Sequence, residues 1–202
     1  MSQAHIKERL LTAAREVFAE SGFQGATVRE ICRRAEANVA AVNYHFGSKD
    51  ELLAAALSFN QLRDLQLANA DPADAPTLRL QRFILGLMRM LLDEHHPASQ
   101  CRIIARELAD PTPLLDQIVA EAVVPLYDFF HGVLREIAGP DLPEAVLRRC
   151  VLSVVAQCFH YRHSAPVLQR VYPDMHHTAE DIEQIAAHIT QFSLAGLRDV
   201  AS

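Results

Sequence analysis

The chain has 202 residues, of which 50% are hydrophobic and 22% are charged, and its formal net charge at pH 7 is −6. This length allows one large or two small domains, and the composition is that of a globular protein that folds in water. No apolar run reaches the ~18 residues of a membrane span, and residues 1–18 lack the apolar core of a signal peptide. We therefore expect a cytoplasmic protein with no membrane segment.

Apolar residues recur at helical spacing along the whole chain, and no strand-like alternation stands out. The sequence therefore predicts an all-α fold. Capping residues and Pro or Gly breaks divide it into about nine helices, expected over residues 6–20, 28–35, 39–46, 49–68, 77–94, 99–108, 114–137, 143–163 and 179–198. The predicted N-caps include Thr27, Asn38, Ser48 and Thr77, with Glu30 and Glu51 completing capping boxes. The stretch 163–178, which contains two prolines, is expected to be irregular.

The second and third predicted helices are short. A helix of two turns is not stable alone, so both must pack against neighbours. The connection between them, residues 36–38, has the length found in a helix-turn-helix. The third helix begins with small residues, which allow close approach to a DNA groove, and ends with Asn43 and Tyr44, whose amide and phenol groups can contact bases or phosphates.

Three motifs mark this segment: Phe18 with Gly22, Thr27-Val28, and the turn from His45 through Phe46-Gly47-Ser48 to Lys49. With them the first 50 residues resemble the DNA-binding domain of the TetR/AcrR family of transcriptional regulators. The resemblance implies a three-helix helix-turn-helix head over residues 1–52 and a six-helix ligand-binding and dimerisation body over residues 53–202. It implies a repressor that binds double-stranded operator DNA and is released by a small-molecule effector.

The resemblance also implies a role for each matched position. Contacts with the DNA backbone are expected from Thr27, Arg29, Tyr44, His45 and Lys49, and contacts with base edges from Val39, Ala40 and Asn43, with a phosphate as the alternative for Asn43. The core of the head is expected to contain Ile31, Ala35, Val42 and Phe46. In the alternative interpretation, Tyr44 and His45 only cover the core. Arg33 and Arg34 are expected on a solvated face, with contact to a phosphate as the alternative.

Two positions depart from the family pattern. Asn43 stands where the family usually has tyrosine, with an aromatic residue one place later. Glu36 stands at the turn position that is usually glycine, which indicates either a strained φ angle or a different turn.

Residues 106–113, Pro125 and residues 153–157 resemble the CecR (YbiH-like) subgroup, as do residues 37–44. That subgroup is associated with tolerance of drugs and toxicants, so the resemblance implies a drug- or toxicant-like effector. Polar groups on otherwise apolar helical faces are the candidate ligand-binding residues: Arg102, Arg106, Glu107, Tyr127, Gln157, His160 and Tyr161. For each, capping, an ion pair within the chain or exposure to solvent is the competing interpretation.

The helices over residues 143–163 and 179–198 are expected to form a homodimer as a four-helix bundle. Their apolar faces carry Val146, Leu147, Val151, Val154, Val155, Ile182, Ile185, Ile189, Phe192 and Leu197. The alternative is that these stripes pack only within one chain.

No cofactor, metal site or catalytic residue is expected. The cysteines (Cys32, Cys101, Cys150 and Cys158) have no CxxC spacing, and the doublets His95-His96 and His176-His177 lack partners at ligand spacing. An all-helical enzyme would need clustered catalytic groups that the sequence does not show. A helical adaptor, or a regulator that activates transcription, remains the alternative function.

Overall fold

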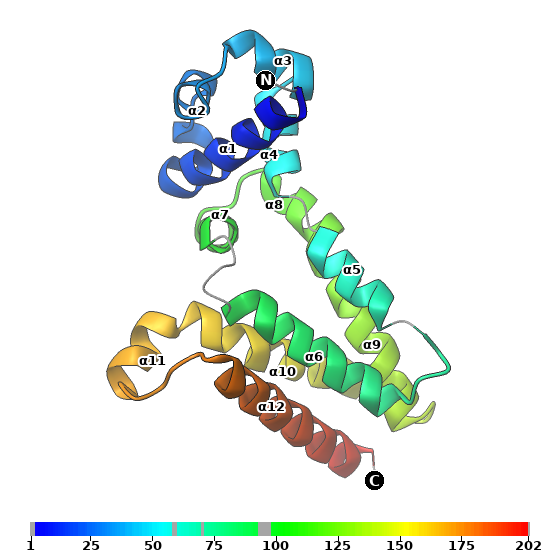
Figure 1. The fold of residues 1–202 in the computed structure, drawn as a ribbon. Coiled ribbons are helices and arrows are strands. Elements are labelled where there is room, and N and C mark those ends of the chain that lie inside the picture. The colour runs from blue at the N-terminus through cyan, green and yellow to red at the C-terminus, as the bar shows by residue number, and fades with distance from the viewer. Residues whose placement is uncertain (1–2, 58–59, 70, 93–97, 202) are drawn as a thin grey trace. The chain divides into compact units, whose positions relative to one another are not determined.

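The computed structural model describes residues 3–57, 60–69, 71–92 and 98–201 (Figure 1). Within these ranges the chain forms helices and no strand, which confirms the all-α fold class, and no helix there is both long and apolar enough to cross a membrane. The helices are α1 (Gln3–Gly25), α2 (Val28–Arg34), α3 (Val39–Phe46), α4 (Lys49–Ala56), α5 (Asn60–Ala68), α6 (Pro76–Leu92), α7 (Ala98–Ala109), α8 (Leu114–Ile118), α9 (Val124–Ala138), α10 (Glu144–His163), α11 (Ala165–Val171) and α12 (Ala179–Val200), with a π-helical turn, η1 (Val119–Val123), before α9.

The helices divide into two compact units. Helices α1–α4 form the first unit together with α7 and α8, and α5, α6 and α9–α12 form the second. Helix α7, which follows α6 in the chain, therefore packs against α1, and α8 packs against α7. The domain boundary expected at residue 52 divides the chain at a single point in the sequence, and it stays a prediction.

Helix α1 is the helix against which most of the first unit packs, because its apolar residues recur on one face. Leu10, Ala14, Val17 and Phe18 are buried there, where α1 packs against α2, α3, α4 and α7. The helical path is kinked at Gly22, whose φ of 68° lies in the region that favours glycine. The end expected at residue 20 lies close to this kink, and α1 continues beyond it to Gly25.

The core of the second unit is built on α6. The Phe83 ring stacks on Phe129, with centroids 4.0 Å apart, and meets Phe130 edge-on at 5.2 Å. At one end of α6, the buried guanidinium of Arg79 forms an ion pair with Glu136 of α9, so its charge is paired. The fully buried face of α6 consists of Leu80, Phe83, Ile84, Leu87 and Met88.

Several helix boundaries differ from those expected. The helix predicted over residues 114–137 is interrupted by η1, because Pro125 has no N–H to donate to the carbonyl four residues earlier. Helix α6 begins at Pro76 rather than after an N-cap at Thr77, since proline is well suited to a first helical turn. The end of this helix predicted at Glu94 lies outside the described residues.

The stretch 163–178 was expected to be irregular, and that prediction is wrong for α11. Pro166 stands in the first turn of α11, where its missing N–H needs no partner. The segment after α11 is irregular, as predicted, until Thr178 opens α12 with a complete capping box to Asp181.

Most apolar residues expected at a dimer interface are buried within their own chain. Helices α10 and α12 pack against each other and against α6, and this contact uses Leu147, Val151, Val154, Val155, Ile182, Ile189 and Leu197. Of the residues expected at the interface, Phe192 is the one whose side chain is largely exposed, at 64%. The exposed face of α10 and α12 is therefore not the apolar face that the sequence predicted for the dimer interface.

Candidate nucleic-acid interface

The two short helices α2 and α3 are held in place by side-chain caps. Thr27 Oγ1 accepts a hydrogen bond from the Glu30 N–H (3.2 Å), and Asn38 Oδ1 accepts one from the Ala40 N–H (2.8 Å). The Glu30 carboxylate does not complete a capping box; it accepts hydrogen bonds from Arg33 and Arg34. Both N-caps predicted from the sequence are thus present, and each satisfies one free N–H of its helix.

One face of this helix pair forms the core of the first unit. Ile31, Ala35, Val42 and Phe46 are all buried, as predicted. Their burial fixes which face of α3 points outward, because side chains three or four residues apart share one side of a helix.

The outward face of α3 carries Val39, Ala40, Asn43 and Tyr44, all of them exposed. Tyr44 is 71% exposed, so its phenol does not cover the core. The first turn of this face is small and apolar, and its last turn holds an amide and a phenol. Such a surface can approach the floor of a groove at one end and bind phosphate at the other.

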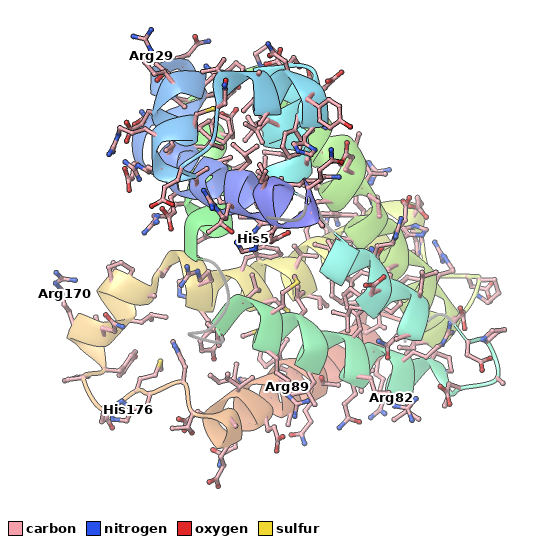
Figure 2. The ribbon with its side chains drawn as sticks, turned by 45° about the horizontal axis from the view of Figure 1, so that its top comes forward. His5, Arg29, Arg82, Arg89, Arg170 and His176 are labelled. Atoms are coloured by element: carbon pink, nitrogen blue, oxygen red, sulfur yellow. The ribbon has the colours of Figure 1, made fainter. Side chains whose placement is uncertain are left out.

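The flanks of α3 supply groups that suit phosphate. Arg29, on the first turn of α2, projects outward from the ribbon (Figure 2). Thr27 at the start of α2 is exposed, and its hydroxyl, which accepts from Glu30, still has a proton to donate. Lys49 stands in the first turn of α4 with its Nζ 4.2 Å from the centroid of the Phe23 ring.

His45 is half-buried. The centroids of its ring and the Tyr44 ring are 5.0 Å apart, and the two ring planes are nearly perpendicular. The structure thus places the eight residues expected to bind DNA at the N-cap of α2, on α2, on α3 or at the start of α4.

The two arginines expected on a solvated face differ from each other. Arg33 is exposed, but the Arg34 side chain is only 27% exposed and binds carboxylates of two helices, Glu20 of α1 at 2.6 Å and Glu30 at 2.8 Å. Hydrogen bonds from Arg33 and Arg34 lower the pKa of the Glu30 carboxyl to about 2. Arg34 therefore ties α2 to α1 and is not part of a free basic surface.

Of the two possibilities expected for the turn between α2 and α3, a strained φ angle at Glu36 or a different turn, the structure has the strained φ angle. Glu36 has a φ of 45°, and Arg9 of α1 donates hydrogen bonds to the carbonyls of Ala35 and Glu36. Sequence reasoning did not identify Arg9, and no local motif could have done so, because Arg9 lies 26 residues before the first of these carbonyls.

The candidate ligand-binding residues do not form one site. Arg102, Arg106 and Glu107 belong to α7 in the first unit, whereas the others belong to α9 and α10 in the second. Arg106 Nη1 donates to the Glu20 carbonyl at 3.3 Å. Glu107 is buried and accepts hydrogen bonds from the N–H and hydroxyl of Thr112 at 3.0 and 2.7 Å. As adjacent residues on one helix, the two point in different directions.

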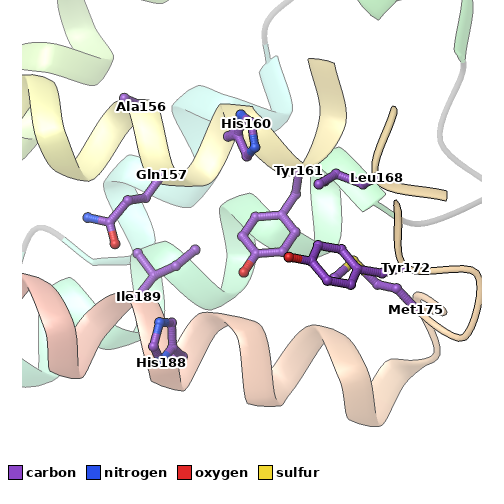
Figure 3. A pocket seen from close by; sticks show the side chains of 9 residues that line it. All are labelled: Ala156, Gln157, His160, Tyr161, Leu168, Tyr172, Met175, His188 and Ile189. Atoms are coloured by element: carbon purple, nitrogen blue, oxygen red, sulfur yellow. The ribbon is translucent and has the colours of Figure 1, made fainter. Parts of the chain in front are cut away.

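The remaining candidates fall into two places. Tyr127 is half-buried on α9, and Gln157, His160 and Tyr161 share one pocket of about 480 Å³ between α10, α11 and α12 (Figure 3). The pocket is lined by Ala156, Gln157, His160, Tyr161, Leu168, Tyr172, Met175, His188 and Ile189.

Hydrogen bonds within the chain hold two of these side chains. The Gln157 amide nitrogen donates to the carbonyl of Ser153 (3.2 Å) and to Ser193 Oγ (3.3 Å), and His160 Nδ1 pairs with Ser164 Oγ (3.1 Å). The lining residues that the structure describes include no Lys, Arg, Asp or Glu. Its chemistry suits an uncharged, partly apolar molecule with a hydrogen-bonding group.

The described residues contain no cluster of three or more His, Cys, Asp or Glu that could hold a metal ion. Cys32 and Cys158 are buried free thiols, and burial raises the pKa of Cys158 to about 12. His95, His96 and the Cys101 side chain lie outside the described part of the chain.

Two family models match the sequence. Residues 10–56 match the model of bacterial regulatory proteins of the tetR family, and residues 76–197 match that of the C-terminal domain of the HTH-type transcriptional dual regulator CecR. The second match covers more than half of the chain. The proteins these models describe are regulators of transcription and not enzymes.

Individual proteins agree with this assignment. An HTH-type transcriptional repressor of Mycobacterium tuberculosis H37Rv is 33% identical over 130 residues, which are 64% of this chain and 64% of that protein. The match therefore spans slightly less than two thirds of the relative's length.

Solved structures share the fold. A transcriptional regulator from Pseudomonas aeruginosa PAO1 has a TM-score of 0.72 at 21% identity, covering 98% of this chain and 95% of that one. SmeT, the repressor of the Stenotrophomonas maltophilia multidrug efflux pump SmeDEF, has a TM-score of 0.66 at 20% identity, covering 94% and 89%. At these identities the likeness concerns the fold alone, and the family rests on the sequence matches: the chain belongs to the TetR family of bacterial transcriptional regulators, in the branch with a CecR-type C-terminal domain.

Proposed function

We propose that this protein is a homodimeric transcriptional repressor that binds operator DNA through α3 and is released by a small-molecule effector. The observation that carries the proposal is the division of α3 into two faces. One face is buried in the core, and the other exposes Val39, Ala40, Asn43 and Tyr44. Because the cell's DNA is its ligand, we infer that the protein acts in the cytoplasm.

In this proposal α3 enters the major groove. Val39 and Ala40 contact base edges or thymine methyl groups, and Asn43 binds adenine or a phosphate. The other five residues bind the DNA backbone on both sides of the groove: Thr27, Arg29, Tyr44, His45 and Lys49. Lys49 adds its charge to the positive end of α4, which favours a phosphate there.

The charge distribution supports this orientation. Residues 1–50 carry seven Lys and Arg against six Asp and Glu, a balance of +1, so the rest of the chain carries −7. An acidic body is repelled by DNA, and the first residues are therefore the part that approaches it.

We propose that the dimer forms through the outward faces of α10 and α12. Leu152 and Phe192 are large exposed apolar residues on these helices. Phe192 lines a groove between them together with Cys150, Val154 and Gly196. A β-carbon added at Gly196 would meet no atom within 4 Å, so a partner helix could approach closely there. A two-fold axis through this face would bury Phe192 of both copies.

We propose that the effector binds in the pocket of Gln157, His160 and Tyr161. A volume of 480 Å³ falls in the range of drug-sized ligands. Two phenols, two imidazoles and an amide there offer hydrogen bonds, and Leu168, Met175 and Ile189 offer apolar contact. The CecR-type C-terminal domain, whose subgroup is associated with tolerance of drugs and toxicants, favours a drug-like effector here.

Selection of preferred sequences from random DNA tests operator binding. The wild-type protein is expected to enrich a palindromic site. Asn43→Ala and Tyr44→Ala should each weaken binding to that site about tenfold or more, as loss of a good contact costs about 1–3 kcal/mol. Leu67→Ala, which truncates another large exposed side chain, is the control and should leave binding unchanged. Enrichment of no sequence at moderate salt would disprove operator binding.

Release of the selected DNA by a library of drug-like aromatic compounds tests the effector site. A compound that releases the DNA should lose potency in Tyr161→Phe and Gln157→Ala, because each change removes a hydrogen-bonding group from the pocket. If both variants respond as the wild type does, the effector binds elsewhere in the body.

A further inference from the structure

The turn between α2 and α3 is a Schellman motif with an unusual residue at its centre. The Glu36 N–H donates to the Arg33 carbonyl (3.3 Å), and the Ala37 N–H donates to the Cys32 carbonyl (2.9 Å). This motif places one residue in the left-handed region, a position usually held by glycine, and Glu36 occupies it with a φ of 45°. A residue with a side chain is less stable in that conformation than glycine.

The guanidinium of Arg9 binds the backbone on both sides of this strained position. Its Nε donates to the Ala35 carbonyl at 2.8 Å, and its Nη2 donates to the carbonyls of Ala35 and Glu36, the latter at 2.7 Å. Nη2 also lies 3.6 Å from the Glu36 carboxylate. These carbonyls are at the end of α2, where no further turn of helix can use them.

We propose that Arg9 is a positioning residue for DNA reading: it holds Glu36 in the left-handed conformation and so sets the direction in which α3 leaves the turn. The inference rests on the proposed operator binding. Val39 and Ala40, the expected base-contacting residues, begin α3 only three and four residues after Glu36. A small change in the Glu36 dihedral angles would therefore move them, and a binding site tolerates displacements of only about 0.5 Å or 10–20°.

A second arginine of α1 provides a matched control. Arg15 Nε donates to the Ala56 carbonyl at the end of α4, at 2.9 Å. Arg9 and Arg15 thus make the same kind of contact from the same helix, but the contact of Arg15 does not involve the turn before α3. Loss of either should lower stability, and only loss of Arg9 should alter DNA reading.

The test combines Arg9→Ala with Glu36→Gly, because glycine adopts the left-handed conformation without help. On the DNA sequence that the wild type selects, Arg9→Ala should lower affinity about tenfold, which corresponds to ~1.4 kcal/mol. It should change affinity for unrelated DNA far less. Glu36→Gly alone should bind as the wild type does, and the double variant should recover most of the lost affinity.

Three results would overturn the inference: full affinity in Arg9→Ala, no recovery in the double variant, or an equal loss in Arg15→Ala. If Arg9→Ala does not fold, Arg9→Lys carries the test, since lysine keeps the charge but lacks the planar fork that spans two carbonyls.

Hydrogen exchange of the Ala37 amide gives a readout without DNA. The exchange should be faster in Arg9→Ala than in the wild type, slow again in the double variant, and unchanged in Arg15→Ala. If the wild type selects no DNA sequence, operator binding fails as a proposal. The Ala37 measurement then still decides whether Arg9 holds the turn: unchanged exchange in Arg9→Ala would overturn it.

Discussion

The guanidinium of Arg106 in α7 fills the space beside Gly22 of α1 where any other residue would carry its β-carbon. A β-carbon built on Gly22 would lie 2.6 Å from Arg106 Nε and 2.8 Å from Cζ. Gly22 also has a φ of 68°. Because Gly22 has no side chain, it can adopt this φ angle at the kink of α1, and Arg106 of α7 can pack against it.

Gly22→Ala should therefore destabilise the protein. We expect a loss of about 1–3 kcal/mol from the left-handed backbone alone, with a further loss because Arg106 must move. The free energy of unfolding measured by urea denaturation tests this. Gly132→Ala is the control, because a β-carbon on this α9 glycine meets nothing within 4 Å, and it should stabilise the helix by up to ~1 kcal/mol. Equal effects of the two substitutions would contradict the role given to Gly22.

The Glu30 carboxylate should make stability depend on pH below its ordinary titration range. Hydrogen bonds from Arg33 and Arg34 lower its pKa from 4.5 to about 2 in the folded state. A lowered pKa gives stability that is present above pH 4.5 and is lost as the pH falls toward 2, because the unfolded chain takes up the proton first.

The measurement is the melting temperature of the wild type and of Glu30→Gln at pH 6 and pH 3. The wild type should lose more stability on acidification than Glu30→Gln, which has no proton to gain at this position. Asp174→Asn is the control, since Asp174 is exposed between α11 and α12, and it should keep the wild-type pH dependence. A Glu30→Gln variant with the wild-type pH dependence would show that this carboxylate contributes no such linkage.

Phe192→Glu should weaken the proposed dimer. A charge placed at the centre of an apolar interface replaces a large aromatic contact, and loss of such a contact costs at least about 2 kcal/mol, or ~30-fold in the dimer dissociation constant. Sedimentation velocity over a concentration series measures the effect. Leu67→Glu is the matched control, because Leu67 of α5 is 68% exposed and Phe192 is 64% exposed. If Phe192→Glu has the dissociation constant of the wild type, the dimer forms through another surface.

The Cys158 thiol should resist modification while the protein is folded. Its pKa is raised to about 12 by burial, and only the thiolate reacts readily with disulfide reagents. In a Cys101→Ser background at pH 8, peptide mapping should show labelling of Cys158 in the urea-unfolded protein well before it appears in the folded protein. Cys158 should react only as the protein unfolds. Labelling of Cys158 at the same rate in both states would show that burial does not protect this thiol.

The sequence by itself determined the features that depend on neighbouring residues. The caps at Thr27 and Asn38 and the burial of Ile31 and Val42 follow from hydrogen bonds and helical periodicity within a few residues. The residues expected to contact DNA were placed on α2 and α3 by the same local patterns together with the family resemblance.

Only the tertiary structure decided contacts between distant segments. The hydrogen bonds of Arg9 to the turn at Glu36 and the packing of Arg106 beside Gly22 join residues far apart in the chain. The same holds for the pocket that combines Gln157 with Tyr172 and His188. Periodicity shows which face of a helix is apolar, but not which neighbour covers it. For this reason the stripes of α10 and α12 could not be assigned to the core or to a partner until their packing against α6 was known.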